Sequence, residues 1–189
     1  MHPIQPIVAR PLRWQSSQRL RRALLPDDWR SWLLEPGSLT QRLRHCCGGR
    51  FHVELLGQQL QRPLRDEAEA LGRPPHELAL VRQVRLCCDD APWVFARTVI
   101  PLPSLNSGLK RLDQLGSRPL GELLFSDPGM QRSIVEVSRL WPGHPLHPLS
   151  GAAPDTPLWG RRSVFTLYRC PLLVSEFFLP QLLTRGMPR

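Results

Sequence analysis

Two charged side chains stand among apolar ones in strand-like stretches of this 189-residue chain, and they are its first candidates for chemistry. Side chains alternate between the two faces of a strand, so ALVRQVRL places Arg82 on a face with aliphatic neighbours, and PLLVSEFFLP does the same for Glu176. A buried charge is costly unless it is paired or hydrogen-bonded. Arg82 and Glu176 therefore either satisfy each other or backbone groups, or line one pocket whose ligand is anionic at one end and hydroxylated at the other.

Two further charges lie on predicted strands. Arg97 shares a face with Trp93, Phe95 and Val99, which makes it a third residue to consider for the pocket. Glu136 faces the side opposite its two valine neighbours and is predicted to be solvated.

Two predicted helix starts offer backbone donors. Ser38 begins an S/T-x-x-Q capping box, so Leu39 is the first residue of a helix, and Leu120 follows Pro119 at another start. The first N–H groups of a helix have no partner within it, which suits them to an anion or a carbonyl. The alternative is that water or capping side chains satisfy them.

Motifs for cofactor chemistry are missing from the sequence. It contains neither G-x-G-x-x-G nor a P-loop, and no G-x-S-x-G nucleophile elbow. The histidines beside Cys46-Cys47 do not follow a zinc spacing, and His144 and His147 lack a third ligand. We therefore expect any reaction to proceed without a cofactor or a metal.

The predicted elements define an α+β domain in which antiparallel strands carry segregated helices. Charged, proline-containing residues 62–76 read as a loop. Residues 141–157 hold five prolines and two glycines and read as an exposed or partly disordered insertion in a single domain spanning 1–189. Helices are predicted over 29–34, 38–47, 104–115 and 120–125, and strands over 51–55, 78–88, 92–100, 131–140, 163–169 and 172–179.

The composition limits the binding partners and the cell compartment that we expect for this protein. The formal net charge is +9, and residues 1–50 carry nine arginines against three acidic residues. A basic stretch of this kind could bind nucleic acid or an anionic membrane surface. Scattered solvated arginines are the better explanation of the charge, because no recognition motif accompanies them, so we expect no nucleic-acid partner. No apolar run is long enough to span a membrane, and the first thirteen residues do not form a secretory signal. Five cysteines without C-x-x-C predict reduced thiols and a cytoplasmic protein.

Several blocks of the chain resemble the chorismate pyruvate-lyase family, which makes 4-hydroxybenzoate for ubiquinone. The resemblance runs from about residue 29 to 180, and its main departure is the proline-rich stretch before LWGRR. It implies one antiparallel sheet with helices packed on one side and a ligand buried beneath helical flaps. The blocks are SWLLEPGSLTQRL, VRQVRLCCDDAPWVFARTVIP, LGSRPLGELLF, LWGRRSVF and PLLVSEFFLP.

The resemblance also implies site residues and a reaction. The family's ligand contacts match Leu39, Arg82, Leu120 and Glu176, with Arg82 and Glu176 as the catalytic pair. Pyruvate would be eliminated from chorismate without cofactor, by a monomer, as the ring becomes aromatic. Arg82 would clamp a carboxylate through its planar fork. Glu176 would meet the ring hydroxyl or act as acid or base, and its apolar neighbours favour a protonated form.

A second class of function fits the same pocket. The fold of the family resembles the effector-binding domains of some bacterial transcription regulators, so a non-catalytic sensor of aromatic acids is the alternative. The chain carries no helix-turn-helix pattern to support a regulator.

Overall fold

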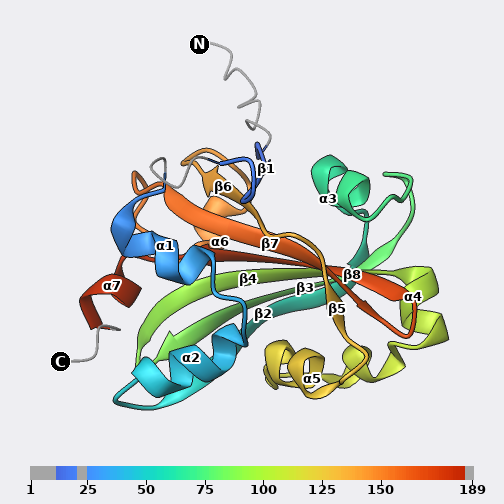
Figure 1. The fold of residues 1–189 in the computed structure, drawn as a ribbon, viewed down its shortest axis with the longest axis horizontal. Coiled ribbons are helices and arrows are strands. Elements are labelled where there is room, and N and C mark those ends of the chain that lie inside the picture. Colours follow the sequence, from blue (N-terminus) through green and yellow to red (C-terminus); the bar gives the residue numbers. More distant parts are fainter. Residues whose placement is uncertain (1–11, 21–24, 186–189) are drawn as a thin grey trace, which may run out of the picture.

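An eight-stranded antiparallel sheet forms the centre of the computed structural model, which describes residues 12–20 and 25–185 (Figure 1). The strand order is β1-β6-β7-β8-β4-β3-β2, and the short β5 also pairs with β7. The strands are β1 (Gln15–Ser16), β2 (Phe51–Gln61), β3 (Ala79–Cys88), β4 (Ala91–Pro101), β5 (Gln131–Arg132), β6 (Glu136–Leu140), β7 (Leu158–Leu167) and β8 (Cys170–Phe178).

Two hairpins make the middle of the sheet. β3 and β4 turn at Asp89, and β7 and β8 turn at Tyr168 and Arg169, all three with positive φ as tight hairpin turns require. β4 then pairs with β8, so the strands that carry Arg82 and Glu176 are separated by one strand only. The strands predicted over 78–88, 92–100 and 172–179 are confirmed. The strand predicted over 163–169 instead spans Leu158–Leu167, and the one predicted over 131–140 is divided into β5 and β6. β2, predicted to end at residue 55, continues to Gln61 with a register shift before Gly57.

Most of the helical cover lies on one face of the sheet, where Figure 1 shows α1, α2, α4 and α5. The short α3 and α6 add cover to the opposite face, together with Leu12 and Trp14. The single antiparallel sheet and the α+β class are confirmed. The helices are α1 (Asp27–Leu33), α2 (Leu39–Cys46), α3 (Arg65–Ala70), α4 (Leu102–Ser107), a 3₁₀ helix (Lys110–Gln114), α5 (Leu120–Ser126), α6 (His147–Ser150) and α7 (Gln181–Arg185).

Apolar clusters fill both faces of the sheet, which explains the near-continuous burial of β3, β4 and β8. On the α2 and α5 face, one cluster packs α1 and α2 against β3 and β4, and a second packs α4 and α5 against β7 and β8. The opposite face is closed around Phe95, Phe177 and Leu173. The two clusters on the first face leave a space between them, and the candidate site lies there.

Two stretches predicted as loops are partly helical. Residues 62–76 contain α3, whose first turn is capped when the Glu67 carboxylate accepts a hydrogen bond from the Leu64 N–H at 2.8 Å.

The proline-rich stretch 141–157 is not the exposed loop that its composition predicts. It contains α6, and the side chains of Leu146, His147 and Ser150 are buried. Arg85 donates through Nε to the Leu149 carbonyl at 2.9 Å. A flexible linker in its place would uncover apolar side chains of the sheet.

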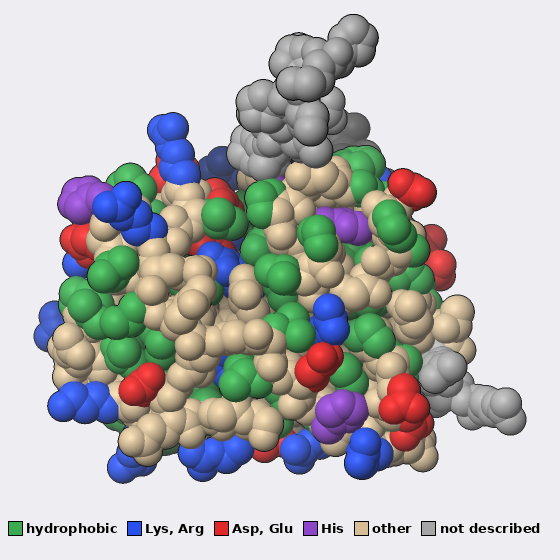
Figure 2. All heavy atoms as spheres, turned by 180° about the vertical axis from the view of Figure 1, so that it is seen from behind, with side chains coloured by type: hydrophobic (Ala, Val, Ile, Leu, Met, Phe, Trp, Pro, Cys, Tyr) green, Lys and Arg blue, Asp and Glu red, His purple; other side chains and the backbone are tan. Residues whose placement is uncertain are grey.

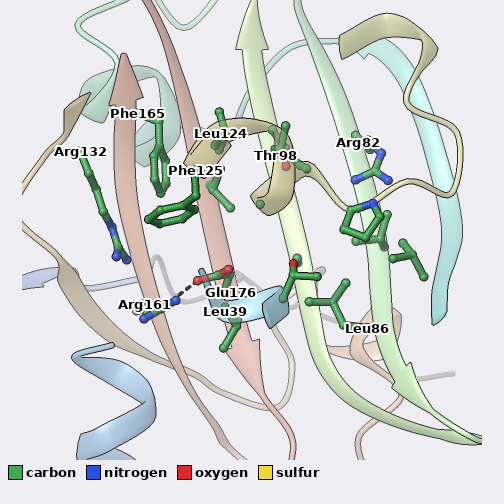
Figure 3. Close-up of a pocket in the computed structure, with 18 residues that line it drawn as sticks. Leu39, Arg82, Leu86, Thr98, Leu124, Phe125, Arg132, Arg161, Phe165 and Glu176 are labelled. Carbon is green, nitrogen blue, oxygen red and sulfur yellow. Dashed lines mark hydrogen bonds and ion pairs between the residues drawn. The ribbon is translucent and has the colours of Figure 1, made fainter. Parts of the chain in front are cut away.

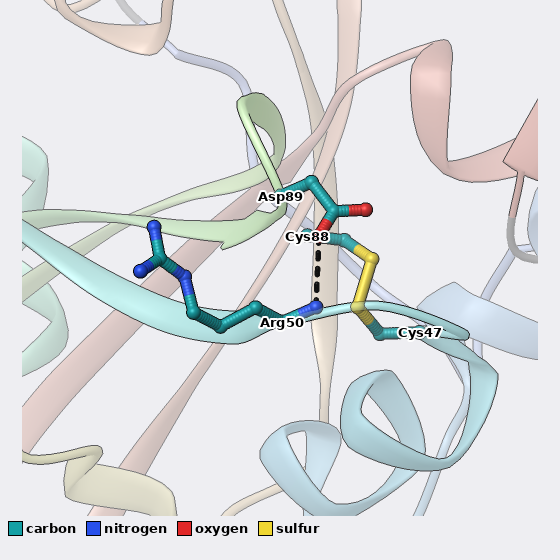
Figure 4. Close-up of a disulfide and its surroundings, with 4 residues drawn as sticks. All are labelled: Cys47, Arg50, Cys88 and Asp89. Carbon is teal, nitrogen blue, oxygen red and sulfur yellow. Dashed lines mark hydrogen bonds between the residues drawn. A yellow bond between two sulfur atoms is a disulfide. The ribbon is translucent and has the colours of Figure 1, made fainter.

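The structure corrects the expectation that all cysteines are reduced. Cys47 and Cys88 form a disulfide that ties the end of α2 to the end of β3 (Figure 4). Cys46, Cys87 and Cys170 remain as thiols, and burial raises the pKa of the Cys87 thiol to about 11. The expectation that all five cysteines are reduced is therefore wrong for one pair.

Charge on the surface is dispersed. On the face that Figure 2 shows, basic side chains lie mostly toward the edges, with acidic and apolar side chains between them. Among the described residues, no helix is long and apolar enough to cross a membrane. The first eleven residues, where a secretory signal would stand, lie outside the described residues.

Replacing Cys47 and Cys88 together by serine is expected to lower the free energy of unfolding by about 4 kcal/mol. The bond joins residues 41 positions apart, and losing it frees a loop of that length in the unfolded chain. Urea unfolding of the double variant and of the wild type, each with and without a thiol reductant, measures the difference. The reductant should weaken only the wild type. Equal stabilities without reductant would contradict the structure.

Candidate active site

A pocket lies between the sheet and the N-terminal ends of α2 and α5 (Figure 3). All four residues singled out in the sequence, Leu39, Arg82, Leu120 and Glu176, line it. The other lining residues are Thr40, Val53, Val84, Leu86, Ala96, Thr98, Pro119, Gly121, Leu124, Phe125, Arg132, Arg161, Phe165 and Val174.

Arg82 is a buried cation without a buried anion to balance it. Its side chain is 3% exposed, and no acidic side chain of the described residues forms an ion pair with it. Nη2 donates to the carbonyls of Gly116 at 2.9 Å and Arg118 at 3.1 Å, whereas Nε is buried with no partner. Burial lowers the pKa of Arg82 from its ordinary value. A guanidinium in this state can offer a donor and a full charge to an anionic ligand.

Glu176 does not pair with Arg82, and its environment is not purely apolar. Arg161 stands directly opposite Glu176 across the β7–β8 ladder and donates through Nε to Oε2 at 2.6 Å. The apolar neighbours of Glu176 along the strand do not predict this partner, and the structure places a guanidinium beside its carboxyl group. Glu176 Oε1 accepts no hydrogen bond from a described residue and remains available to the pocket as an acceptor.

Arg161 itself is fixed by the backbone of the α1–α2 connection. It is 2% exposed, and its Nη1 donates to the carbonyls of Trp32 at 3.0 Å and Glu35 at 2.9 Å. The preceding residue must be glycine, because a Cβ at Gly160 would overlap the ring of Phe177. Thus the GRR sequence keeps the backbone against the core on one face and sends Arg161 to the other.

Arg132 is a second pocket residue that the sequence analysis did not identify. It belongs to the two-residue β5, and its guanidinium reaches past Phe165 toward Glu176 and Arg161 (Figure 3). All its described hydrogen bonds are to neutral groups: Ser163 Oγ at 3.0 Å and the carbonyls of Glu35 at 3.0 Å and Pro36 at 3.2 Å. Burial, together with the nearby Arg161 charge, lowers the pKa of Arg132 to about 10.

The starts of α2 and α5 meet over the pocket. Ser38 caps α2 as predicted, with Oγ accepting from the Gln41 N–H at 3.4 Å. The helices approach so closely at Gly121 that a Cβ there would stand 3.0 Å from Thr40 Oγ1. Leu39 and Leu120 are therefore both at first helical positions beside the same space, where their amides have no partner within the helix.

Arg97 does not belong to the site. It projects from the opposite face of β4 and forms a buried pair with Glu67, with Nε 2.6 Å from Oε1 and Nη2 3.0 Å from Oε2. Glu136 is also paired rather than solvated alone, since Arg162 donates to it at 2.7 Å.

The two histidines considered as metal ligands are used in local hydrogen bonds. His144 Nδ1 accepts from the Leu146 N–H at 3.2 Å, and His147 Nε2 lies 2.8 Å from the Thr156 carbonyl.

The side chains that line the pocket carry a net positive charge, which favours anionic ligands. Its ionisable groups are three guanidiniums and one carboxylate, a net charge of +2. Two rings, Phe125 and Phe165, meet edge-to-face with centroids 6.0 Å apart and form an apolar wall. The site is thus a cationic pocket with an aromatic wall, set in an α+β domain with one antiparallel sheet.

The comparisons with known proteins make the assignment specific. Residues 9–187 match the family model described as chorismate lyase, and the chain belongs to that family. A relative from Marinobacter nauticus, named "Probable chorismate pyruvate-lyase", is 43% identical over 81% of this chain and 77% of its own length. A relative from Azoarcus with the same name is 44% identical over 84% of this chain and 86% of its own.

Solved structures show the same fold at low identity. PhnF from Mycobacterium smegmatis matches with a TM-score of 0.60 and 16% identity, over 82% of this chain and 67% of that one. The ligand-binding domain of a GntR-family transcriptional regulator from Bordetella bronchiseptica matches with a TM-score of 0.52 and 19% identity, over 70% of this chain and 86% of that one.

Changing Arg97 to Gln is expected to reduce stability and to leave ligand affinity unchanged. Removing one partner of a buried ion pair leaves Glu67 as an uncompensated charge, which costs about 3–5 kcal/mol. Urea unfolding gives the stability, and titration with 4-hydroxybenzoate below the unfolding transition gives the affinity. A tenfold weaker ligand affinity in the folded variant would show that Arg97 reaches the pocket after all.

Proposed function

We propose that this protein is a chorismate pyruvate-lyase that converts chorismate into 4-hydroxybenzoate and pyruvate, in support of ubiquinone synthesis. The observation that carries the proposal is the buried, ion-pair-free Arg82 facing a pocket of net charge +2. Chorismate carries two carboxylates, so its charge matches the lining. The family membership and the names of the relatives point to the same substrate.

Arg82 is proposed to bind the ring carboxylate. Its Nε has no other partner, and a carboxylate would satisfy it with a charged hydrogen bond. The ring would then lie against the aliphatic side chains of the sheet, with α2 and α5 above it. The amides of Leu39 and Leu120 would meet polar atoms of the ligand at its edge.

In the proposed reaction the main task of the protein is to position the substrate, because aromatisation of the ring drives the elimination. The C3–O ether bond breaks with its electron pair passing to oxygen, and the C4–H pair forms the third double bond of the ring. The C4 proton leaves, and the released enolate takes up a proton to become pyruvate. No electrons enter or leave overall, and aromatisation drives the elimination. We therefore propose a carbon–oxygen lyase that works without a cofactor.

Glu176 is proposed to act at the ring hydroxyl or at the C4 proton. Its Oε2 accepts a hydrogen bond from Arg161, and its Oε1 is the acceptor available to the pocket. As a carboxylate it can accept the proton or orient the hydroxyl. The two roles predict different results for a Gln variant.

Turnover is the direct test. Purified protein incubated with chorismate should release pyruvate and 4-hydroxybenzoate in equal amounts, with or without EDTA, as measured by a coupled pyruvate assay and by chromatography. Activity that disappears with EDTA and returns with a metal would contradict the cofactor-free reaction. Tight binding of 4-hydroxybenzoate without any pyruvate release would instead indicate a sensor of aromatic acids.

Variants of Arg82 and Glu176 should separate binding from proton transfer. Arg82→Ala removes a charged hydrogen bond to a group that substrate and product share, so affinity for both should fall about 10- to 100-fold. Glu176→Gln should lower kcat about 10²- to 10⁴-fold with little change in product affinity if Glu176 transfers a proton. Retention of most of the rate would assign it to orientation alone.

Arg85→Ala is the matched control for Arg82→Ala. Arg85 lies on the same strand but projects to the opposite face, where it contacts Leu149 and Glu54. Its loss should leave ligand affinity unchanged. Product binding by Arg82→Ala as tight as in the wild type would overturn the carboxylate assignment.

A further inference from the structure

Arg132 holds a positive charge at the end of the pocket away from Arg82. Figure 3 shows Arg82 and Arg132 on opposite sides, with Glu176 between them. Arg82 belongs to β3, whereas Arg132 belongs to β5, which pairs with the far edge of β7. At roughly 4.8 Å per neighbouring strand, their backbones are about four strand spacings apart. The two long side chains therefore reach inward from opposite ends.

Arg132 forms no ion pair with a described residue. Its described partners are one hydroxyl and two carbonyls, and its Nη2 donates to no described residue. Arg161, its neighbour, differs because it already forms an ion pair with Glu176. One carboxylate thus serves two adjacent guanidiniums at this end, and one positive charge is left over. Arg132 is half-buried, and a partly desolvated cation with no ion pair to a described residue favours an anion at this position.

We propose that Arg132 binds the carboxylate of the enolpyruvyl group and so makes the pocket selective for the dicarboxylate substrate over the monocarboxylate product. This inference rests on the proposed lyase function. Arg82 then takes the carboxylate that substrate and product share, and Arg132 takes the one that departs with pyruvate. As the C3–O bond breaks, negative charge develops on the enolpyruvyl oxygen, next to the carboxylate that Arg132 holds. The guanidinium stabilises that charge as well.

The proposal predicts which ligands each variant distinguishes. The probes are 4-hydroxybenzoate, with one carboxylate, and 3-(1-carboxyvinyloxy)benzoate, an aromatic compound that carries both carboxylates but cannot undergo the elimination. The third probe is the second compound with its enolpyruvyl carboxylate methylated. In the wild type, methylation should weaken binding about 10- to 100-fold, the range of one charged hydrogen bond. This comparison does not depend on any variant folding.

The protein variants complete the test. In Arg132→Gln the acid and its methyl ester should bind about equally, and 4-hydroxybenzoate should bind within threefold of the wild type. Arg132→Lys should keep part of the preference for the acid, since it keeps the charge. Arg65→Gln is the matched control, because Arg65 is exposed on α3 and pairs with Glu69 away from the pocket, so it should behave as wild type. For chorismate, Arg132→Gln should raise KM as well as lower kcat.

Two outcomes would overturn the proposal. One is a wild type that binds the acid and its ester equally. The other is an Arg132→Gln variant that loses affinity for all three probes alike, which would assign Arg132 to holding the Glu35–Pro36 connection only. Failure of the lyase function is a separate result: wild-type protein that releases no pyruvate from chorismate, whatever its preference among the probes.

Discussion

The carbonyl oxygen of Glu35 is the point on which the site depends. It accepts hydrogen bonds from both Arg132, at 3.0 Å, and Arg161, at 2.9 Å. These bonds attach the connection between α1 and α2 to β5 and β7, and they orient two guanidiniums toward the pocket at the same time. This anchor holds the N-terminal side of α2 against the sheet, as the Cys47–Cys88 disulfide holds the other end. The position of Leu39 and the direction of Arg161 are thus two results of one interaction.

Burying arginines has a cost that shapes the rest of the pocket. Arg97 and Arg162, on the opposite face, are each neutralised by acidic partners, as expected for structural charges. On the face of the sheet that lines the pocket the charges are not balanced, because Glu176 is the one acidic residue in a lining that holds three arginines. The protein thus keeps uncompensated charge on the face where a ligand can supply the missing anion. This contrast between faces of one sheet distinguishes binding charges from structural ones.

The sequence alone was enough to find Arg82 and Glu176, because strand alternation assigns a face without knowing which strands are neighbours. It was not enough for their partners. Arg161 follows a strand start at Leu158, whereas the expected strand began at residue 163, so its face could not be assigned. Alternation of Trp159, Arg161 and Phe165 along a longer strand would have revealed it. Arg132 lies in a strand of two residues, too short for any periodic pattern.

Other errors have similar physical origins. α3 is short and polar, so it shows no apolar period, and it is held by a cap and by an ion pair to Arg97 that only the tertiary structure supplies. The proline-rich stretch is covered because its few apolar side chains meet the sheet, which composition does not reveal. The two vicinal cysteine pairs allow several pairings, and only the approach of α2 to β3 selects Cys47 and Cys88.

The wall of the pocket is held together unequally at the sheet and at the contact between α2 and α5. Backbone ladders join every strand under the pocket, whereas the two helices above it meet at Gly121 and through an ion pair between Arg44 and Glu122, 2.7 Å apart and largely in water. An exposed pair of this kind contributes roughly 0–1 kcal/mol. Separating the helices therefore costs far less than separating the strands, so the contact between α2 and α5 is a weaker part of the pocket wall than the sheet.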